Sequence, residues 1–326
     1  MRKTNISIFV PHIGCPQKCS FCNQNTITGQ AKPATAEDVV KAVETAIGNN
    51  KDGKFKYEIA FFGGSFTAVD RDYMISLLEA AQPYLKSGDV DGIRISTRPD
   101  FIDKDVLSIL SKYGVTAIEL GAQSMNDKVL KANLRGHTSE DVKNACALIK
   151  KSGFELGLQM MTDLYTSTRG TDFATAREFA KLKPKTVRIY PTVVLKDTYL
   201  AKLLESGKYN PSPLKKTVAL CAELVQFFEE KDIEVIRVGL HSSEDIKNNM
   251  LAGGYHECLG ELVVSRIMYN KITAHPPGKY EIYINEKSIS KLLGNKKSNI
   301  KALKEAGYDL EIKYNNGLSP NELRVV

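Results

Sequence analysis

The sequence predicts an α/β fold built on a parallel β-sheet, and three observations support this prediction. Short apolar, β-branched runs alternate with amphipathic helical stretches over most of the 326 residues, and this alternation is typical of βαβ units. The apolar runs are nearly continuous, which favours strands covered on both faces. Six or seven repeats fit a curved, incomplete (β/α) barrel, and a flat doubly wound sheet is the alternative.

The expected elements alternate in order along the chain. The strands are Ile6–Val10, Tyr57–Phe62, Gly92–Ser96, Val115–Leu120, Phe154–Met160, Thr186–Tyr190 and Ile233–Val238. The helical patterns lie near residues 36–48, 71–85, 103–113, 139–151, 172–182 and 212–230. Helix-start signals support several of them, such as Thr35 with Asp38 and Ser139 before the run that follows. In barrels of this kind the reacting groups sit at the C-terminal ends of the strands, so the residues there are the candidates for a site.

Composition and charge limit the class of protein. Hydrophobic content of 42% and charged content of 25% are ordinary globular values, and the length suits one large domain plus a small one. We find no apolar stretch near the roughly 20 residues that cross a bilayer, and residues 1–10 are too short for a signal peptide. The formal net charge of +7 permits a polyanionic partner. We therefore expect a soluble, cytoplasmic protein with no membrane partner.

Three cysteines follow the first expected strand in the pattern C-x-x-x-C-x-x-C. Iron–sulfur clusters are held by Cys thiolates and usually take four of them. Cys15, Cys19 and Cys22 are closely spaced with no obvious fourth thiol, which would leave one iron open to a ligand that is not protein. Because structural metal sites are closed and reactive ones keep an open position, the pattern predicts a reactive iron–sulfur site.

Two other uses of these thiols need weighing. A tetrahedral zinc site needs a fourth ligand, for which His12 is the nearest candidate. A disulfide framework is not favoured, because six cysteines in 326 residues are sparse and the other three are scattered singly. Cys146 and Cys221 lie on helical patterns, where a free Cys behaves as a small buried hydrophobe. Such thiols indicate a reducing cytoplasm.

The stretch from Pro11 to Asn23 resembles the cluster loop of radical S-adenosylmethionine (SAM) enzymes, in which an aromatic residue typically precedes the third Cys, as Phe21 does here. It is similar to the radical SAM domain of the Elongator catalytic subunit, a tRNA-modifying enzyme, and more distantly to the oxygen-independent coproporphyrinogen oxidases. The resemblance spans residues 5 to 270 and implies an incomplete (β/α)6-type radical SAM barrel. It also implies a [4Fe–4S] cluster on the three cysteines, with SAM on the fourth iron, cleaved on reduction to methionine and a 5′-deoxyadenosyl radical.

Residues after the other strands match SAM-binding positions of those families. Gly63 and Gly64, whose backbone can approach a ligand closely, resemble the glycine motif that binds the methionine amino group. Gln123 and Arg135 match a Gln and an Arg that contact SAM in the coproporphyrinogen oxidases, and a guanidinium suits the SAM carboxylate. The structural alternatives are turn glycines, a loop glutamine and a surface arginine.

Other positions depart from one family or stay open. Ser96 stands where related enzymes often place a Glu, and Gln159 where the coproporphyrinogen oxidases have an Asp for the ribose. Met160-Met161-Thr162-Asp163-Leu164 matches the Elongator-like pattern, although at least one of the two methionines is expected to be plain core. Arg98 serves either substrate or structure. No catalytic residue is predicted. Three further residues are candidates to line a substrate cavity: His241, His256 and Cys258.

The pattern changes from about residue 279. The expected order is a strand, a helix, a basic turn, a helix and a strand: Glu281–Asn285, Ser288–Leu293, Gly294-Asn295-Lys296-Lys297, Ser298–Ala306 and Leu310–Tyr314. This order resembles the core of a KH module, whose GXXG loop clamps nucleic-acid backbone, although Lys297 replaces the second glycine. Six lysines and no acidic residue lie between Lys287 and Lys304, which favours phosphate. The alternative is a solvated cap on the barrel.

The sequence therefore predicts a partial barrel over residues 1–275 and a small basic KH-like extension over 276–326. The predicted function is a radical SAM enzyme acting on RNA, with tRNA favoured and an electron donor such as ferredoxin or flavodoxin. The residues after 275 are expected to be too few for the acetyltransferase domain of the Elongator subunit. The alternatives are a small-molecule radical SAM oxidoreductase of the coproporphyrinogen oxidase type, and a non-catalytic metal- or RNA-binding protein.

Overall fold

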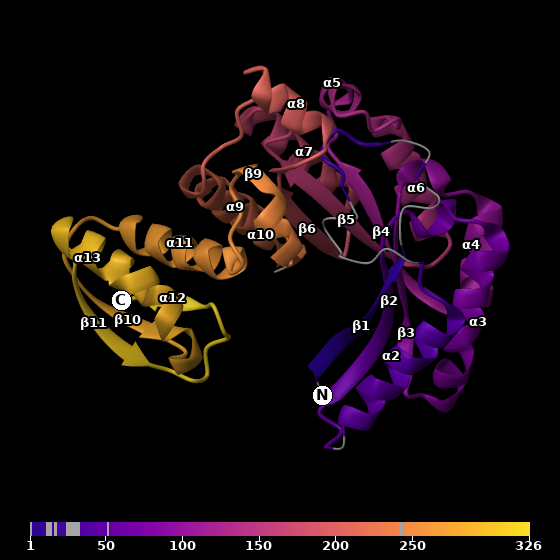
Figure 1. Ribbon diagram of the computed structural model, residues 1–326. Coiled ribbons are helices and arrows are strands. Elements are labelled where there is room, and N and C mark those ends of the chain that lie inside the picture. Colours follow the sequence, from indigo (N-terminus) through magenta and orange to yellow (C-terminus); the bar gives the residue numbers. More distant parts are fainter. Residues whose placement is uncertain (1, 11–14, 16–17, 24–32, 51, 242–243) are drawn as a thin grey trace.

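Seven parallel strands form the central sheet of the computed structural model, which describes residues 2–10, 15, 18–23, 33–50, 52–241 and 244–326. The strand order is β1-β2-β3-β4-β5-β6-β8, and the sheet curls into a half-barrel (Figure 1). The strands are β1 (Arg2–Val10), β2 (Phe55–Gly63), β3 (Val90–Thr97), β4 (Val115–Gln123), β5 (Glu155–Thr162), β6 (Thr186–Pro191) and β8 (Glu234–Val238). All seven expected strands are present, and the curl confirms the incomplete barrel over the flat alternative.

Helices between the strands cover the outer, convex face of the sheet (Figure 1). They are α2 (Ala36–Asn49), α3 (Arg71–Ser87), α4 (Lys104–Lys112), α6 (Ser139–Lys151), α7 (Arg169–Leu182) and α9 (Leu214–Glu229). The Thr35–Asp38 capping box is confirmed. A second capping box, Thr138 with Asp141, starts α6 at Ser139. These helices and the outer face of the sheet enclose one large apolar core.

The two faces of the sheet differ in polarity, so the expectation of strands covered on both faces is wrong. Ile59, Ile93 and Ile118 point outward and are fully buried in the core. The residues next to them in sequence alternate to the concave face, as Arg94 and Glu119 do. The physical reason is that the concave face encloses a cavity, lined by charged as well as apolar side chains, instead of a second layer of helices.

Several short elements at the carboxyl ends of the strands were not predicted, because they are too short to show a hydrophobic period. β7 (Val193–Leu195) pairs antiparallel with β9 (Met250–Gly253). The short helices are α5 (Asp127–Ala132), α8 (Tyr199–Glu205) and α10 (Glu244–Asn249). Among the helices of the described residues, none is long and apolar enough to span a membrane.

A small α+β unit follows the barrel and has its own core. Its sheet has the order β11-β10-β12, with β10 parallel to β11 and antiparallel to β12. Its elements are β10 (Lys279–Ile284), α12 (Ile289–Leu293), α13 (Ser298–Glu305), β11 (Asp309–Tyr314) and β12 (Leu323–Val325). The predicted strand–helix–turn–helix–strand order is therefore present.

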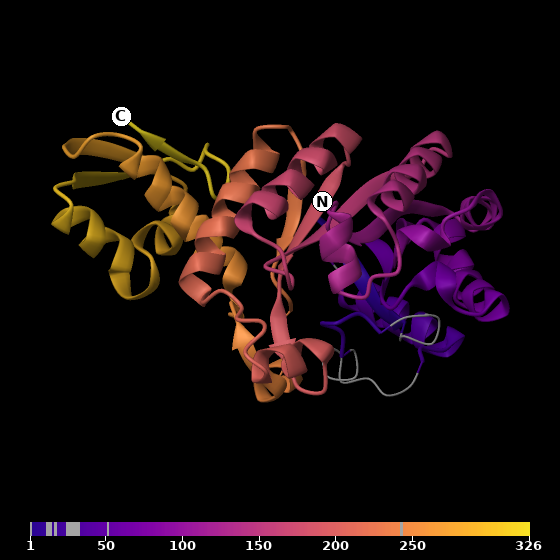
Figure 2. The ribbon, with the colours of Figure 1, turned by 90° about the horizontal axis from the view of Figure 1, so that it is seen from above.

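One long helix joins the two cores. α11 (Leu259–Thr273) buries Val263 and Ile267 in the barrel core, and Met268 and Ile272 in the core of the extension. In Figure 2 the extension lies beside the half-barrel with α11 between them. Because its apolar residues face two cores, this helix has no single apolar face for a sequence pattern to reveal.

Candidate active site

The concave face of the half-barrel encloses a cavity of about 550 Å³, a volume typical of small-molecule sites. Residues from every strand of the main sheet and from β7 line it, together with the loops that follow β1, β2 and β4. The carboxyl ends of parallel strands meet at one edge of the sheet, so residues distant in sequence share this cavity.

The three cysteines of the predicted cluster loop all line the cavity. Cys15 Sγ lies 3.5 Å from Ser65 Oγ, and Cys19 is buried. Burial and the neighbouring Cys19 raise the pKa of the Cys22 thiol well above its usual range. Within the described ranges, no group of three or more His, Cys, Asp or Glu is placed to hold a single metal ion. His12, the possible zinc ligand, lies outside the described residues.

Buried hydrogen bonds anchor the cysteine loop to distant parts of the chain. The Ser20 amide donates to the Asn133 carbonyl at 3.0 Å, and the Ser20 hydroxyl donates to Asn133 Oδ1 at 2.8 Å. The Ser20 carbonyl accepts from the amide of Leu200 in α8 at 2.9 Å. The loop after β1 is therefore held between the end of α5 and the start of α8.

Arg135 lies against the cysteine loop. Its Nη1 donates to Cys19 Sγ at 3.1 Å, and its Nη2 donates to the Gly121 carbonyl at 2.5 Å. The guanidinium also lies over the Phe21 ring, 6.0 Å from the centroid. Its Nε is buried with no hydrogen-bond partner among the described residues. The surface-arginine alternative is wrong, because Arg135 is only 5% exposed.

Arg98, for which the sequence left substrate or structure open, positions Arg135. It binds the Asp100 carboxylate through Nε at 2.9 Å and Nη2 at 2.8 Å. The same Nη2 donates to the backbone carbonyl of Arg135 at 2.6 Å.

Burial, with the nearby Arg135 charge, lowers the pKa of His137 to about 4, so this imidazole is neutral near pH 7.

The glycines and the glutamine of the predicted SAM site also line the cavity: Gly63, Gly64 and Gln123. Gly63 has φ +112°, and a Cβ there would lie 2.0 Å from the Phe9 ring, so no side chain fits. Gln123 has φ 66° at an irregularity in β4, and its Oε1 accepts from Gln159 Nε2 at 3.1 Å.

The structure separates the remaining candidates. His241, Ser96 and Met161 line the cavity, whereas Met160 is fully buried in the core, as expected for one of the two methionines. His256 and Cys258 are not among the described residues that line it. The Cys258 amide donates instead to His256 Nδ1 at 3.0 Å.

Asp163 of the Elongator-like motif is not among the described residues that line the cavity. Its Oδ2 accepts from the Ser212 amide at 2.5 Å, and its own amide donates to Asp172 Oδ2 at 3.0 Å. The motif therefore joins the loop after β5 to the segment before α9. Burial raises the pKa of Asp172 to about 7.

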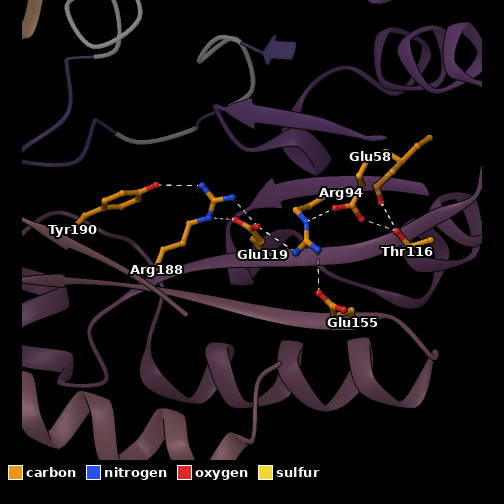
Figure 3. A network of polar contacts seen from close by, with 8 residues as sticks. Glu58, Arg94, Thr116, Glu119, Glu155, Arg188 and Tyr190 are labelled. Atoms are coloured by element: carbon orange, nitrogen blue, oxygen red, sulfur yellow. Dashed lines mark hydrogen bonds and ion pairs between the residues drawn. The ribbon is translucent and has the colours of Figure 1, made fainter. Parts of the chain in front are cut away.

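A buried network of charges, not predicted from the sequence, crosses the inside of the half-barrel (Figure 3). Glu119, 4% exposed, lies between two arginines: Oε2 is 2.6 Å from Arg188 Nε, and Oε1 is 3.3 Å from Arg94 Nη1. Arg94 also binds Glu58 at 2.8 Å and Glu155 at 3.0 Å. The sequence does contain a signal for this network, because a charged residue interrupts each of several apolar strands.

The two ends of this network reach different spaces. Arg188 lies over the Phe62 ring at 4.6 Å and donates to the Tyr190 hydroxyl at 3.3 Å, beside the main cavity. Glu58 and Glu155 line a smaller polar pocket of about 190 Å³ with Arg94. The network therefore gives each of its two arginines at least one carboxylate partner inside the half-barrel.

The described residues thus define an α/β half-barrel protein with three closely spaced thiols at the carboxyl edge of its sheet. The family model for the Radical SAM superfamily matches residues 9–182, and the model for the Radical SAM C-terminal domain matches residues 184–269. The chain therefore belongs to the Radical SAM superfamily.

Named relatives agree with the predicted Elongator likeness. The chain is 25% identical over 257 residues to tRNA uridine(34) acetyltransferase of Dehalococcoides mccartyi, covering 68% of this chain and 55% of that protein. It is 33% identical over 236 residues to human Elongator complex protein 3, covering 65% of this chain and 42% of that protein. The chain thus spans about half the length of these relatives.

A solved structure shares the fold. The archaeal Methanocaldococcus infernus Elp3 with an N-terminal deletion superposes with a TM-score of 0.65 and 21% identity, covering 83% of this chain and 64% of that one. The Radical SAM superfamily consists of enzymes that use a [4Fe–4S] cluster and SAM, so the predicted enzyme class and cofactors are confirmed.

The donor groups in the cavity fit these cofactors. Three thiols on one short loop suit a cluster, because iron–sulfur clusters bind Cys thiolates. The unpartnered, buried Nε of Arg135 offers a charged donor beside them, and such a donor matches a carboxylate.

We expect Glu119→Gln to destabilise the protein by about 3 to 5 kcal/mol, because it leaves Arg94 and Arg188 buried without a full counter-charge. The free energy of unfolding in urea measures this change. Glu155→Gln is the matched control. The Glu155 side chain is 37% exposed, and exposed pairs contribute only about 0 to 1 kcal/mol. Equal losses in the two variants would contradict a special role for the buried centre of the network.

Proposed function

We propose that this protein is a radical SAM enzyme that modifies RNA, with tRNA as the substrate. The main support for radical SAM chemistry is that the three cysteines and Arg135 all line one cavity. The names of the relatives, an Elongator complex protein and a tRNA uridine(34) acetyltransferase, support tRNA as the substrate class.

In this proposal Cys15, Cys19 and Cys22 hold the [4Fe–4S] cluster. Gly63 and Gly64 bind the amino group of SAM through their backbone. Gln123 and Arg135 contact the rest of the molecule, Arg135 through the carboxylate. When bound and reduced, cluster and SAM supply a 5′-deoxyadenosyl radical that abstracts hydrogen. An electron donor of low potential, such as ferredoxin or flavodoxin, provides the reduction.

The surrounding residues position these groups. Arg98 fixes the backbone of Arg135, and the Arg135 side chain reaches from the loop after β4 to the cysteine loop after β1. The Ser20 and Asn133 hydrogen bonds lock the other side of that loop.

The extension supports an RNA partner. Between Lys287 and Lys304, five lysines are exposed: Lys287, Lys296, Lys297, Lys301 and Lys304. Lys296 and Lys297 adopt φ values of 50° and 61° in the turn after Gly294, so Lys297 keeps a left-handed conformation where the KH pattern has its second glycine. Adjacent lysines on an exposed turn between two helices suit a phosphate backbone.

We expect Cys19→Ala to lose the cluster, because two thiolates cannot replace the three that the loop supplies. Iron and sulfide content and visible absorbance, measured after anaerobic reconstitution, report this loss. Cys146→Ala is the control, since Cys146 is a buried thiol in the barrel core, and it should keep a full cluster. A normal iron and sulfide content in Cys19→Ala would contradict the assignment of the ligands.

We expect Lys296→Gln/Lys297→Gln/Lys301→Gln to weaken tRNA binding and flatten its salt dependence. Each lost phosphate contact lowers the slope of log K against log salt by about 0.7 to 0.9, so three contacts give a change of about 2. Filter binding over a range of salt concentrations measures it. The control triple variant replaces lysines exposed on the convex helices, Lys41, Lys86 and Lys112, by Gln. Equal slopes in the two triple variants would leave the extension as a structural cap.

A further inference from the structure

We propose that the half of the cavity formed by β6, β7 and β8 is a nucleotide site in which Arg237 binds a phosphate group of the substrate. This inference rests on the proposed function and adds to it the chemical group that the enzyme recognises next to the reacting nucleoside.

The cavity divides between two sets of strands. The residues proposed for cluster and SAM follow β1, β2 and β4, whereas β6, β7 and β8 supply a separate wall. That wall contains Tyr190, Leu195, Arg237, Leu240 and His241. Since none of the proposed SAM contacts comes from it, this wall is available to the substrate.

Most of the arginines that line the cavity are already engaged. The Asp100 carboxylate binds Arg98 through two hydrogen bonds. The buried Glu119 carboxylate neutralises Arg188. Arg135 binds Cys19 and the Gly121 carbonyl. Arg98 Nη1 and Arg135 Nε remain without a partner among the described residues, but both arginines lie on the side of the cavity proposed for the cluster and SAM, and Arg135 is already assigned to the SAM carboxylate.

Arg237 lies on the opposite wall from Arg98 and Arg135 and, unlike Arg98 and Arg188, is not held by a carboxylate. Its Nε donates to the Gly239 carbonyl at 3.1 Å, and in the described part of the chain no carboxylate forms an ion pair with it. The side chain is half-buried at the cavity wall. The bond to Gly239 fixes the guanidinium while its two terminal nitrogens stay open to a ligand. A fixed guanidinium fork in a partly desolvated position matches the geometry of a phosphate.

The neighbouring residues fit the rest of a nucleotide. The Tyr190 ring lines the same wall, and its hydroxyl is held by Arg188 Nη1 at 3.3 Å. Leu195 and Leu240 add apolar surface beside it. Proteins bind unstacked bases against aromatic side chains, and enzymes that modify a base move it out of the stack into a pocket. An aromatic and apolar wall beside Arg237, which has no carboxylate partner among the described residues, therefore suits a single nucleotide of RNA.

The test compares nucleotide and nucleoside binding to the full chain, reconstituted with its cluster and SAM and kept without reductant. Uridine 5′-monophosphate should bind about tenfold or more tightly than uridine, as expected for a charged hydrogen-bonded pair. Arg237→Gln should remove this difference and leave uridine affinity unchanged, and Arg237→Lys should restore part of it. Arg177→Gln, which replaces an exposed arginine of α7, should behave as the wild type.

Each result that contradicts the proposal leads to a different conclusion. Equal affinity for nucleotide and nucleoside in the wild type, including undetectable binding of both, would overturn the phosphate site, as would a nucleotide preference that survives in Arg237→Gln. Binding of the 5′-carboxylate analogue as tightly as the phosphate would indicate a carboxylate site instead. Because binding is measured without turnover, these results do not depend on SAM cleavage. Failure of the wild type to cleave SAM would overturn the proposed function itself.

Discussion

The cavity depends on a balance of charges buried inside the half-barrel. An isolated buried charge is costly unless it is paired and hydrogen-bonded, and Glu119 meets this condition by lying between Arg94 and Arg188. Its contacts join strands β3, β4 and β6, and Arg94 extends them to Glu58 on β2 and to Glu155 on β5. The concave face can therefore stay polar and open, where a conventional barrel would fill its interior with branched apolar side chains.

The loops at the carboxyl edge of the sheet line the part of the cavity that contains the three cysteines. Contacts from later in the chain fix the described residues of the cysteine loop: Arg135 on Cys19, and Asn133 and Leu200 on Ser20. These contacts reach across more than a hundred residues of sequence. In the proposed assignment, the cofactors lie near β1 to β4 and the substrate near β6 to β8, and this separation gives Arg237 its proposed role.

The sequence predicted the strands, the helices and the cysteines because each carries a local signal. The Thr35 capping box, the apolar strands and the C-x-x-x-C-x-x-C spacing are all readable within a few residues. The charged network was missed because its members lie on five strands and become a unit only when the sheet curls. α11 was missed because its apolar residues serve two cores. The role of Arg98 could not be predicted from the sequence because its partner, the backbone of Arg135, lies 37 residues away.

The central claim is that this cavity cleaves SAM reductively in the service of RNA modification. The most direct test is the release of 5′-deoxyadenosine, detected by mass spectrometry, from anaerobically reconstituted protein reduced with dithionite, with and without tRNA. The account predicts 5′-deoxyadenosine and methionine in equal amounts, formed faster when tRNA is present. Protein with a full complement of iron and sulfide that releases no 5′-deoxyadenosine under either condition would contradict it.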